Sequence, residues 1–307
     1  MESAAPVTDS AFRMQLRDCP VCGIPANRVL GLRGGAYHRY HLGVATPIVQ
    51  CERCELIFPN PFPYAVDVSD LYGDPAKYFA GVDEQEKVDR YRPLVRDGLK
   101  RSTVKKPRIL DVGSGRGELL RAARAEGVAD VVGLELSHPM VEHSRDKHGL
   151  VVHKRTIEQY AVETDETFDI IFMNAVIEHV YEPDAMMAAA RKLTRPGSLM
   201  YIDLPREPHL LSMIGNRLNR LRGSPAVFNL APTFPPYHVF GFSPKTMRLL
   251  LDKHGFDMTD LLVWADPRIP TSNRWKDRLV STVATQINRA ANVLKLAANM
   301  CGWAVRR

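Results

Sequence analysis

The chain has 307 residues, of which 45% are hydrophobic and 25% charged, with a net charge of +6 and a pI near 9.1. This ordinary globular composition allows a sizeable core in two domains or in one large domain with an appendage, and the mild basicity suits an acidic partner or a merely solvated surface. Apolar runs stay far short of the ~18 residues that cross a membrane, and the first residues lack a secretory signal, so a cytoplasmic location is expected.

Residues 1–15 are predicted to be a disordered leader, and a cysteine-bounded module follows at residues 16–64. Four of the five cysteines form two pairs in this module, Cys19-x-x-Cys22 and Cys51-x-x-Cys54. In a reducing compartment such pairs indicate metal ligands rather than disulfides, and four thiolates suit a tetrahedral zinc ion. The stretch between the pairs is longer than the usual about 15–20 residues, so this zinc-ribbon-like hairpin carries extra chain. We predict structural zinc at the four cysteines, with unmetallated thiols as the alternative.

The polar, helix-like residues 65–106, with a break expected at Pro93, are predicted to form a helical linker or lid. From residue 107 the pattern changes, because short β-branched runs alternate with helical stretches as far as Pro205. The predicted strands are RILDVG, DVVGLELS, LVVHKRT, FDIIFMNAV and SLMYIDLP. This alternation predicts an α/β fold in which a parallel sheet carries helices on both faces.

The C-terminal part of the chain adds two irregular segments to this pattern. Insertions are predicted at residues 206–242 and 265–300, and residues 275–299 within the second are amphipathic. Between the insertions, Ser243 at an N-cap and Pro244 at the first helical position predict a helix over SPKTMRLLLDKHGF. A strand is expected in FDMTDLLVWAD, and the chain stops at GWAVRR, a candidate last strand.

A glycine-rich loop, Gly113-Ser-Gly115-Arg-Gly117, follows a strand that carries Asp111 and precedes a helix. Its GxGxG spacing differs from the GxGxxG of dinucleotide folds, and it lacks the Gly-Lys-Ser/Thr ending of a P-loop. The next strand is followed by Glu135, whose carboxylate can accept two hydrogen bonds from a ribose diol in a dinucleotide site or a sulfonium site. The glycine spacing and the EHV segment after the fourth strand disfavour the dinucleotide.

These motifs, in this order, resemble class I S-adenosylmethionine-dependent methyltransferases. DVGSGRGELL is similar to the first motif of that family, and the text from FDIIFMNAV to SLMYIDLP is similar to its fourth and fifth strands. YHVFGFSPKTMRLLLDKHGF resembles a segment of the subgroup that includes ubiquinone-type O-methyltransferases and sugar methyltransferases. The resemblance covers about half of the chain. It implies a methyltransferase domain over residues 107–307, with a Rossmann-like, mostly parallel sheet whose last strand is antiparallel.

The resemblance also implies a set of cofactor contacts. Gly113 and Gly115 would lie against the methionine part of S-adenosylmethionine, and Asp111 would orient the loop or bind the amino group. Glu135 would hold the ribose hydroxyls. Many relatives place an Asp where this chain has Thr156, at the expected adenine edge. The predicted cofactor-binding residues are Asp111, Gly113, Ser114, Gly115, Gly117, Glu135, Leu136, Thr156, Ile157 and Asn174.

Two further resemblances concern the cysteines and the acceptor. CPVCG and VQCERCELIFPNPFP resemble the N-terminal zinc module of certain sugar C-methyltransferases, which implies structural zinc in a module that helps to enclose substrate. Transfer to oxygen or carbon usually also needs a base, and two histidines are candidates. His179 follows the fourth strand at the edge where open α/β folds bind ligands, and His238 lies in PPYHVFGF. Each histidine could instead cap a helix or bind backbone.

The predicted function is S-adenosylmethionine-dependent methyl transfer to an O or C atom of a sugar, a glycan or another small-molecule acceptor. An RNA methyltransferase with a zinc module and a non-catalytic scaffold in envelope or glycan assembly are the alternatives. The fourth strand lacks the Asp/Asn-Pro-Pro-Tyr/Phe motif of enzymes that methylate base amino groups, so nucleic acid is not the expected partner. The intact glycine loop argues against a scaffold. Basic amphipathic residues 209–223 and 275–299 predict either a lid or a peripheral membrane contact.

Overall fold

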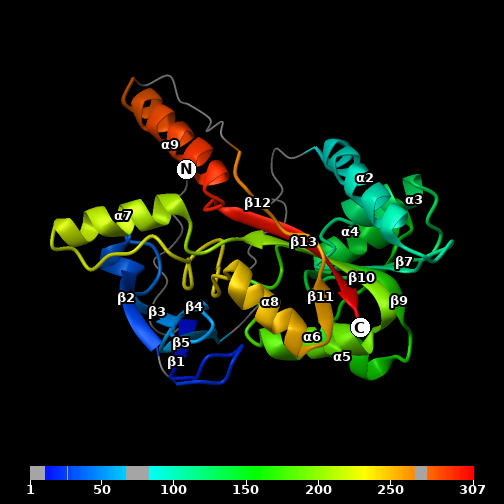
Figure 1. The fold of residues 1–307 in the computed structure, drawn as a ribbon. Helices are drawn as coiled ribbons and strands as arrows, with labels where there is room; N and C mark the ends of the chain where they lie inside the picture. The colour runs from blue at the N-terminus through cyan, green and yellow to red at the C-terminus, as the bar shows by residue number, and fades with distance from the viewer. Residues whose placement is uncertain (1–10, 26, 67–82, 267–274) are drawn as a thin grey trace. The chain divides into compact units, whose positions relative to one another are not determined.

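The computed structural model describes residues 11–25, 27–66, 83–266 and 275–307, with the side chains of 275–280 left out (Figure 1). The chain forms two compact units, and each is described by itself. The cysteine unit comprises residues 1–66, 204–249 and 261–301, and the sheet unit comprises residues 67–203, 250–260 and 302–307. Within the described part of the chain, no helix combines the length and hydropathy of a membrane span.

The cysteine unit contains two small antiparallel sheets. β1 (Phe12–Gln15) pairs with β5 (Phe62–Ala65), and the second sheet has the order β2 (Asn27–Arg33), β3 (Thr46–Cys51), β4 (Ile57–Pro59). The leader predicted through residue 15 is therefore too long. Backbone pairing with β5 and burial of Phe12 order residues 12–15, whereas residues 1–10 lie outside the described part.

The predicted insertions supply the rest of the cysteine unit. Residues of the first insertion pack on the second sheet, where Val227 and Leu230 form a buried cluster with Ile48 and Ile57. The amide of Ile57 also donates to the carbonyl of Gly241, at 3.0 Å. The helices and the short strand are α7 (Leu210–Leu221), α9 (Trp275–Val293) and β12 (Leu262–Trp264).

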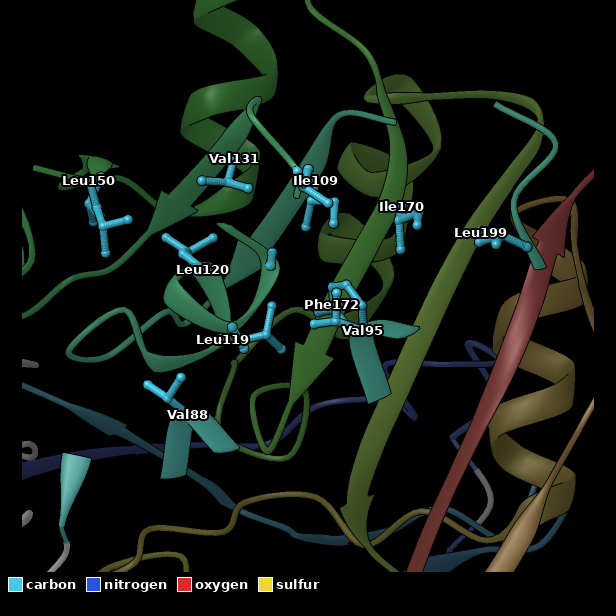
Figure 2. Packing of buried hydrophobic residues seen from close by; sticks show 14 of the residues in the cluster. Val88, Val95, Ile109, Leu119, Leu120, Val131, Leu150, Ile170, Phe172 and Leu199 are labelled. Carbon is cyan, nitrogen blue, oxygen red and sulfur yellow. The ribbon is translucent and has the colours of Figure 1, made fainter. Parts of the chain in front are cut away.

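The sheet unit is built on one sheet with the order β8-β7-β6-β9-β10-β13-β11. The first five strands in this order are parallel, and β13 runs antiparallel to β10 and β11 (Figure 2). The predicted α/β fold with an antiparallel last strand is thus confirmed. The strands are β6 (Ile109–Val112), β7 (Val131–Leu134), β8 (Val151–His153), β9 (Phe168–Asn174), β10 (Thr194–Pro205), β11 (Phe256–Met258) and β13 (Asn299–Arg306).

The expected strand in FDMTDLLVWAD is interrupted in the structure. β11 and β12 flank a break, where the amides of Thr259 and Asp260 both point to the carbonyl of Trp303, at 2.9 and 3.4 Å. Two donors opposite one acceptor disrupt the regular ladder, so each short strand pairs separately with β13.

Helices cover this sheet, and the first of them contradicts the expected break at Pro93. α2 (Glu84–Arg101) passes through Pro93, although a proline inside a helix costs about 3 kcal/mol. Val88 and Val95, one on each side of the proline, are buried in the core of the sheet unit. Burying each valine contributes about 1.5–3 kcal/mol, which offsets the loss. The other helices of this unit are α3 (Glu118–Ala125), α4 (His138–His148), α5 (Ile157–Glu163) and α6 (Pro183–Lys192), and α8 (Pro244–Lys253) begins in the cysteine unit and ends in the sheet unit.

The core of the sheet unit lies between α2, α3 and the strands (Figure 2). Phe172 on β9 is fully buried and meets the ring of Trp303 on β13 nearly edge-on, with centroids 5.8 Å apart. Gly98 on α2 permits this packing, because a Cβ there would lie 2.8 Å from the Trp303 ring. This packing fixes the strands whose carboxyl ends carry the candidate site.

Candidate functional site

The glycine loop between β6 and α3 has a backbone that requires glycine. Gly113, Gly115 and Gly117 have φ of 73°, 53° and 80°, in the left-handed region that disfavours residues with a Cβ. A Cβ on Gly113 would also lie 2.7 Å from Cγ2 of Val176. The amides of Gly113 and Ser114 both donate to the carbonyl of Leu134 at the end of β7, at 2.8 and 2.9 Å. The loop is therefore held against the sheet with its backbone close-packed.

Glu135, the expected ribose ligand, fastens this loop to the start of α4. Its Oε2 accepts from the amide of Gly115 at 2.9 Å, and its Oε1 accepts from the amide of Ser137 at 2.8 Å. Each carboxylate oxygen has a second lone pair, so the group can still accept hydrogen bonds from a diol. The neighbouring Leu136 is exposed.

The expected adenine-edge residues serve the start of α5. The hydroxyl of Thr156 accepts from the amide of Gln159 at 3.2 Å, and the Gln159 side chain accepts from the Thr156 amide at 3.0 Å. This reciprocal capping box stabilises the helix terminus and explains Thr156 locally. Ile157 is buried.

Three acidic side chains gather near the carboxyl ends of the central strands. Asp111 on β6 is buried, and burial together with the charge of Glu118 raises its pKa well above the usual value. Burial raises the pKa of Glu178, in the turn after β9, to about 8, and that of Asp203 on β10 to about 6. Asp203 is the register partner of Asn174 at the end of β9. A cationic ligand would favour the ionised form of these acids, as a sulfonium and an ammonium group do.

Glu178 and Asp203 were absent from the residues predicted from sequence. Glu178 is fully buried, and both its carboxylate oxygens lack a hydrogen-bond partner in the described residues. Asp203 could have been found, because it stands where the apolar strand SLMYIDLP turns polar. Glu178 lies in the EHV segment noted in the sequence, but its burial could not be predicted there, since it depends on the fold of the turn after β9.

The two candidate histidines fall in different units. His179 lies beside Glu178, with Nε2 3.8 Å from Oε1 of that carboxyl, and its amide donates to the carbonyl of Val176 at 2.9 Å. His238 belongs to the cysteine unit, where its carbonyl accepts from the amide of Ala231 at 3.1 Å. The sheet unit therefore brings together the glycine loop, Glu135, the three acids and His179.

In the cysteine unit, the four predicted metal ligands converge. Their Sγ atoms all lie within 4.8 Å of one another, and the shortest separations are 3.4 Å, for Cys19 with Cys54 and for Cys22 with Cys51. Four thiolates around zinc at about 2.3 Å would lie ~3.8 Å apart, so the arrangement fits the ion. No sulfur pair forms a disulfide among these cysteines.

The backbone around the two cysteine pairs repeats. The amides of Gly23 and Glu55 donate back to the carbonyls of Cys19 and Cys51, at 2.8 and 3.0 Å, and both residues have left-handed φ. Glu55 adopts this conformation although it is not a glycine, and its carboxylate forms an ion pair with Lys245, 2.9 Å away. Two equivalent turns thus present two sulfurs each, as a structural zinc site requires.

A second histidine-containing cluster has a different character. Glu84 at the start of α2 lies 3.1 Å from Nε2 of His143 and 3.3 Å from that of His148. Lys147 and Arg121 also reach its oxygens, at 3.2 and 3.3 Å. Although burial alone would raise the pKa of Glu84, the hydrogen bond from Lys147 and the histidines lower it to about 2. These cations compete with a metal ion, so the cluster is an ion-pair junction between α2, α3 and α4.

Known proteins with similar sequences are methyltransferases. A family model described as a methyltransferase domain matches residues 83–261. The ubiquinone biosynthesis O-methyltransferase of Mesorhizobium japonicum is 33% identical over 99 residues, which cover 31% of this chain and 39% of that protein. The protein of the same name from Hahella chejuensis is 30% identical over 163 residues, covering 49% of this chain and 68% of that protein.

Solved structures also resemble this chain in fold. A chain of the complex between the Trm112 methyltransferase activator of Haloferax volcanii and a methyltransferase superposes with a TM-score of 0.51. The two chains are 16% identical, and the match covers 76% of this chain and 97% of that one. At this identity the likeness concerns the fold alone. The chain spans less than half the length of the Mesorhizobium relative.

Proposed function

Because the chain belongs to the class I S-adenosylmethionine-dependent methyltransferases, we propose that it methylates an O or C atom of a small-molecule acceptor, with a sugar or glycan as the first candidate. The observation that carries this proposal is the glycine loop, which Glu135 fastens to the start of α4, in the same unit as the buried Asp111 and the buried, unpaired carboxylate of Glu178. The two ubiquinone biosynthesis relatives are O-methyltransferases by name, which favours oxygen as the acceptor atom. The sugar class rests on the resemblance of the cysteine module.

The cofactor-binding residues proposed from sequence suit S-adenosylmethionine chemically. The cofactor supplies an electrophilic methyl group, and the chain has to orient it and to exclude water. Asp111 would pair with the amino group, which would compensate the buried carboxylate. Glu135 would accept from the ribose hydroxyls, and the close-packed backbone of Gly113 and Gly115 would admit the methionine part. Leu136, Thr156, Ile157 and Asn174 complete the proposed set.

A proton acceptor is needed where the acceptor is a hydroxyl or an acidic C–H group. As the new bond to the methyl carbon forms, the acceptor's proton would pass to a ring nitrogen of His179 or His238. Glu178, 3.8 Å from His179, would favour the protonated ring once it is itself ionised. We propose His179 on the strength of this neighbour, and His238 remains a prediction from sequence.

Zinc would bind Cys19, Cys22, Cys51 and Cys54 and hold the cysteine unit together. The supporting observations are the converging sulfurs and the two equivalent turns. All four coordination positions would be filled by thiolates, so the ion would act structurally rather than in methyl transfer.

Titration calorimetry with S-adenosylmethionine tests the proposal first. Asp111→Asn should weaken cofactor binding at least about tenfold, since removing one partner of a buried charge pair costs more than about 1.4 kcal/mol. Asp169→Asn is the matched control: Asp169 is also buried, but it lies at the opposite end of β9, where it accepts from the amide of Arg108 at 2.8 Å. Absence of binding at millimolar cofactor would refute the enzyme assignment.

The acceptor can then be sought directly. The chain is incubated with isotope-labelled S-adenosylmethionine and a fractionated native extract, and mass spectrometry identifies the methylated compound. A labelled sugar or glycan would support the acceptor class, and a labelled RNA or protein would overturn it. His179→Ala should reduce the rate of transfer to that acceptor without changing cofactor affinity, whereas full turnover would remove His179 from the mechanism.

A further inference from the structure

The helix α7 belongs to the cysteine unit (Figure 1), and its polar side chains form hydrogen bonds with other residues of that unit. Ser212, Asn216 and Asn219 lie on one face of this helix, at positions i, i+4 and i+7. The Ser212 hydroxyl donates to Glu207, Asn216 donates to Asn229 at 2.7 Å, and Asn219 donates to the carbonyl of Ala226 at 2.8 Å. A surface helix ordinarily turns its apolar stripe inward, and α7 does the opposite.

Four apolar residues of α7 face outward, whereas Leu210 at its start packs against the cluster of Ala265, Ala291 and Ala297. Leu211, Ile214, Leu218 and Leu221 recur at the spacing of one helix face, opposite the three polar residues. Their exposed fractions are 40%, 36%, 45% and 75%. Phe228, 51% exposed, extends this surface, because its ring lies against Gly215, where a Cβ would be only 2.6 Å away. We call these five side chains the outer face of α7.

The charged residues beside the outer face of α7 are all positive. Arg217, Arg220 and Arg222 are exposed beside it, and none of them forms an ion pair with a described residue. Between Pro208 and Leu251 the chain contains no Asp or Glu. Among the described residues, Arg220 donates only to the carbonyl of Leu30, at 3.4 Å, and the carboxylate of Glu207, against the opposite face of α7, is buried. An apolar stripe flanked by exposed arginines is complementary to a surface that is both apolar and anionic.

We propose that the outer face of α7 docks on an anionic lipid bilayer. Its four aliphatic side chains and Phe228 would enter the boundary between headgroups and acyl chains, with the helix axis along the surface. Arg217, Arg220 and Arg222 would then meet the lipid phosphates. This site goes beyond methyl transfer and does not depend on it. It gives residues 209–223 a specific role, while residues 275–299 are left out of the proposal.

Vesicle co-sedimentation of the full chain tests this docking without cofactor or acceptor, so its outcome is independent of the methyl-transfer proposal. The protein should sediment with equimolar phosphatidylcholine and phosphatidylglycerol, and much less with phosphatidylcholine alone. Ile214→Gln combined with Leu218→Gln should weaken binding roughly tenfold, because apolar contact is lost. Val162→Gln, at an 82% exposed valine of the sheet unit, is the matched control and should bind as wild type does.

The arginines and the mode of contact need separate readouts. Arg217→Gln combined with Arg222→Gln should abolish the preference for anionic vesicles, whereas Arg248→Gln, an exposed arginine on α8, should not. Leu218→Trp should add a fluorescence component that shifts to the blue with anionic vesicles. Equal sedimentation by the wild type and the glutamine variant would overturn the proposal. A dimer that fails to bind vesicles and dissociates on the same substitutions would also overturn it, and would assign the face to a second copy.

Discussion

Replacing Glu178 with Gln should make the protein more stable at neutral and alkaline pH. The folded state raises the pKa of this carboxyl from its ordinary value of 4.5 to about 8, because burial disfavours the charge. The stability associated with the protonated form is complete below pH 4.5 and is lost as the pH rises through 8. Glutamine keeps the shape of the side chain and cannot ionise, so the variant escapes this loss.

The size of the effect follows from the shift. Between pH 4.5 and pH 8, the Glu178 carboxyl ionises in the unfolded chain but stays protonated in the folded protein. This lowers the free energy of unfolding of the wild type by about 1.4 kcal/mol per pH unit, approaching about 5 kcal/mol in total. Relative to the variant, the free energy of unfolding of the wild type should therefore fall by about 1 kcal/mol at pH 5 and by about 3 kcal/mol at pH 7. The gain grows with pH because only the wild type has a group that titrates there.

Urea unfolding at pH 5, 7 and 9, followed through the fluorescence of the buried Trp303, measures this difference. Glu142→Gln, at an exposed carboxylate of α4, is the control and should show no such gain. A difference between the Glu178→Gln and wild-type proteins that stays constant across pH would refute the reasoning. If Glu178 supports His179, the more stable variant should also transfer methyl groups more slowly.

Three further substitutions have defined outcomes. Cys54→Ser should lower the zinc content from one ion per chain to nearly none by elemental analysis; full metal in the variant would contradict the four-thiolate site. Gly113→Ala should lower cofactor affinity and destabilise by about 1–2 kcal/mol, because the left-handed backbone and Val176 both oppose a Cβ; Val176→Ala should restore part of the loss. Ser243→Ala should destabilise by about 1 kcal/mol in urea unfolding, since the Ser243 hydroxyl accepts from the amide of Thr246 at 3.2 Å at the start of α8.

The parts predicted well from sequence are those whose cause is local. The glycine loop and Asp111 belong to one strand–turn–helix segment, so their positions follow from neighbouring residues alone. The Ser243 cap is local in the same sense. The break expected at Pro93 was wrong, because a local rule about proline was outweighed by the burial of Val88 and Val95 in the core.

Within the site, Glu178 shows the same limit of prediction from local sequence. Nothing in its sequence neighbourhood indicates a buried carboxyl, because its desolvation arises from strands and turns distant in sequence. The charge of Asp203, brought close by the pairing of β9 and β10, raises the pKa of Glu178 further. A site residue that acts through its unusual environment is visible only when that environment is folded.

The sequence by itself determined the alternation of strands and helices, the two cysteine pairs and the amphipathic nature of residues 209–223. Only the tertiary structure decided which side of that amphipathic helix faces the protein. A pattern of polar and apolar residues shows that a helix has two different faces, and the ordinary expectation from that pattern is that the apolar face packs. Hydrogen bonds to Glu207, Asn229 and Ala226 hold the polar face of α7 inward, and Leu211, Leu218 and Leu221 are left exposed.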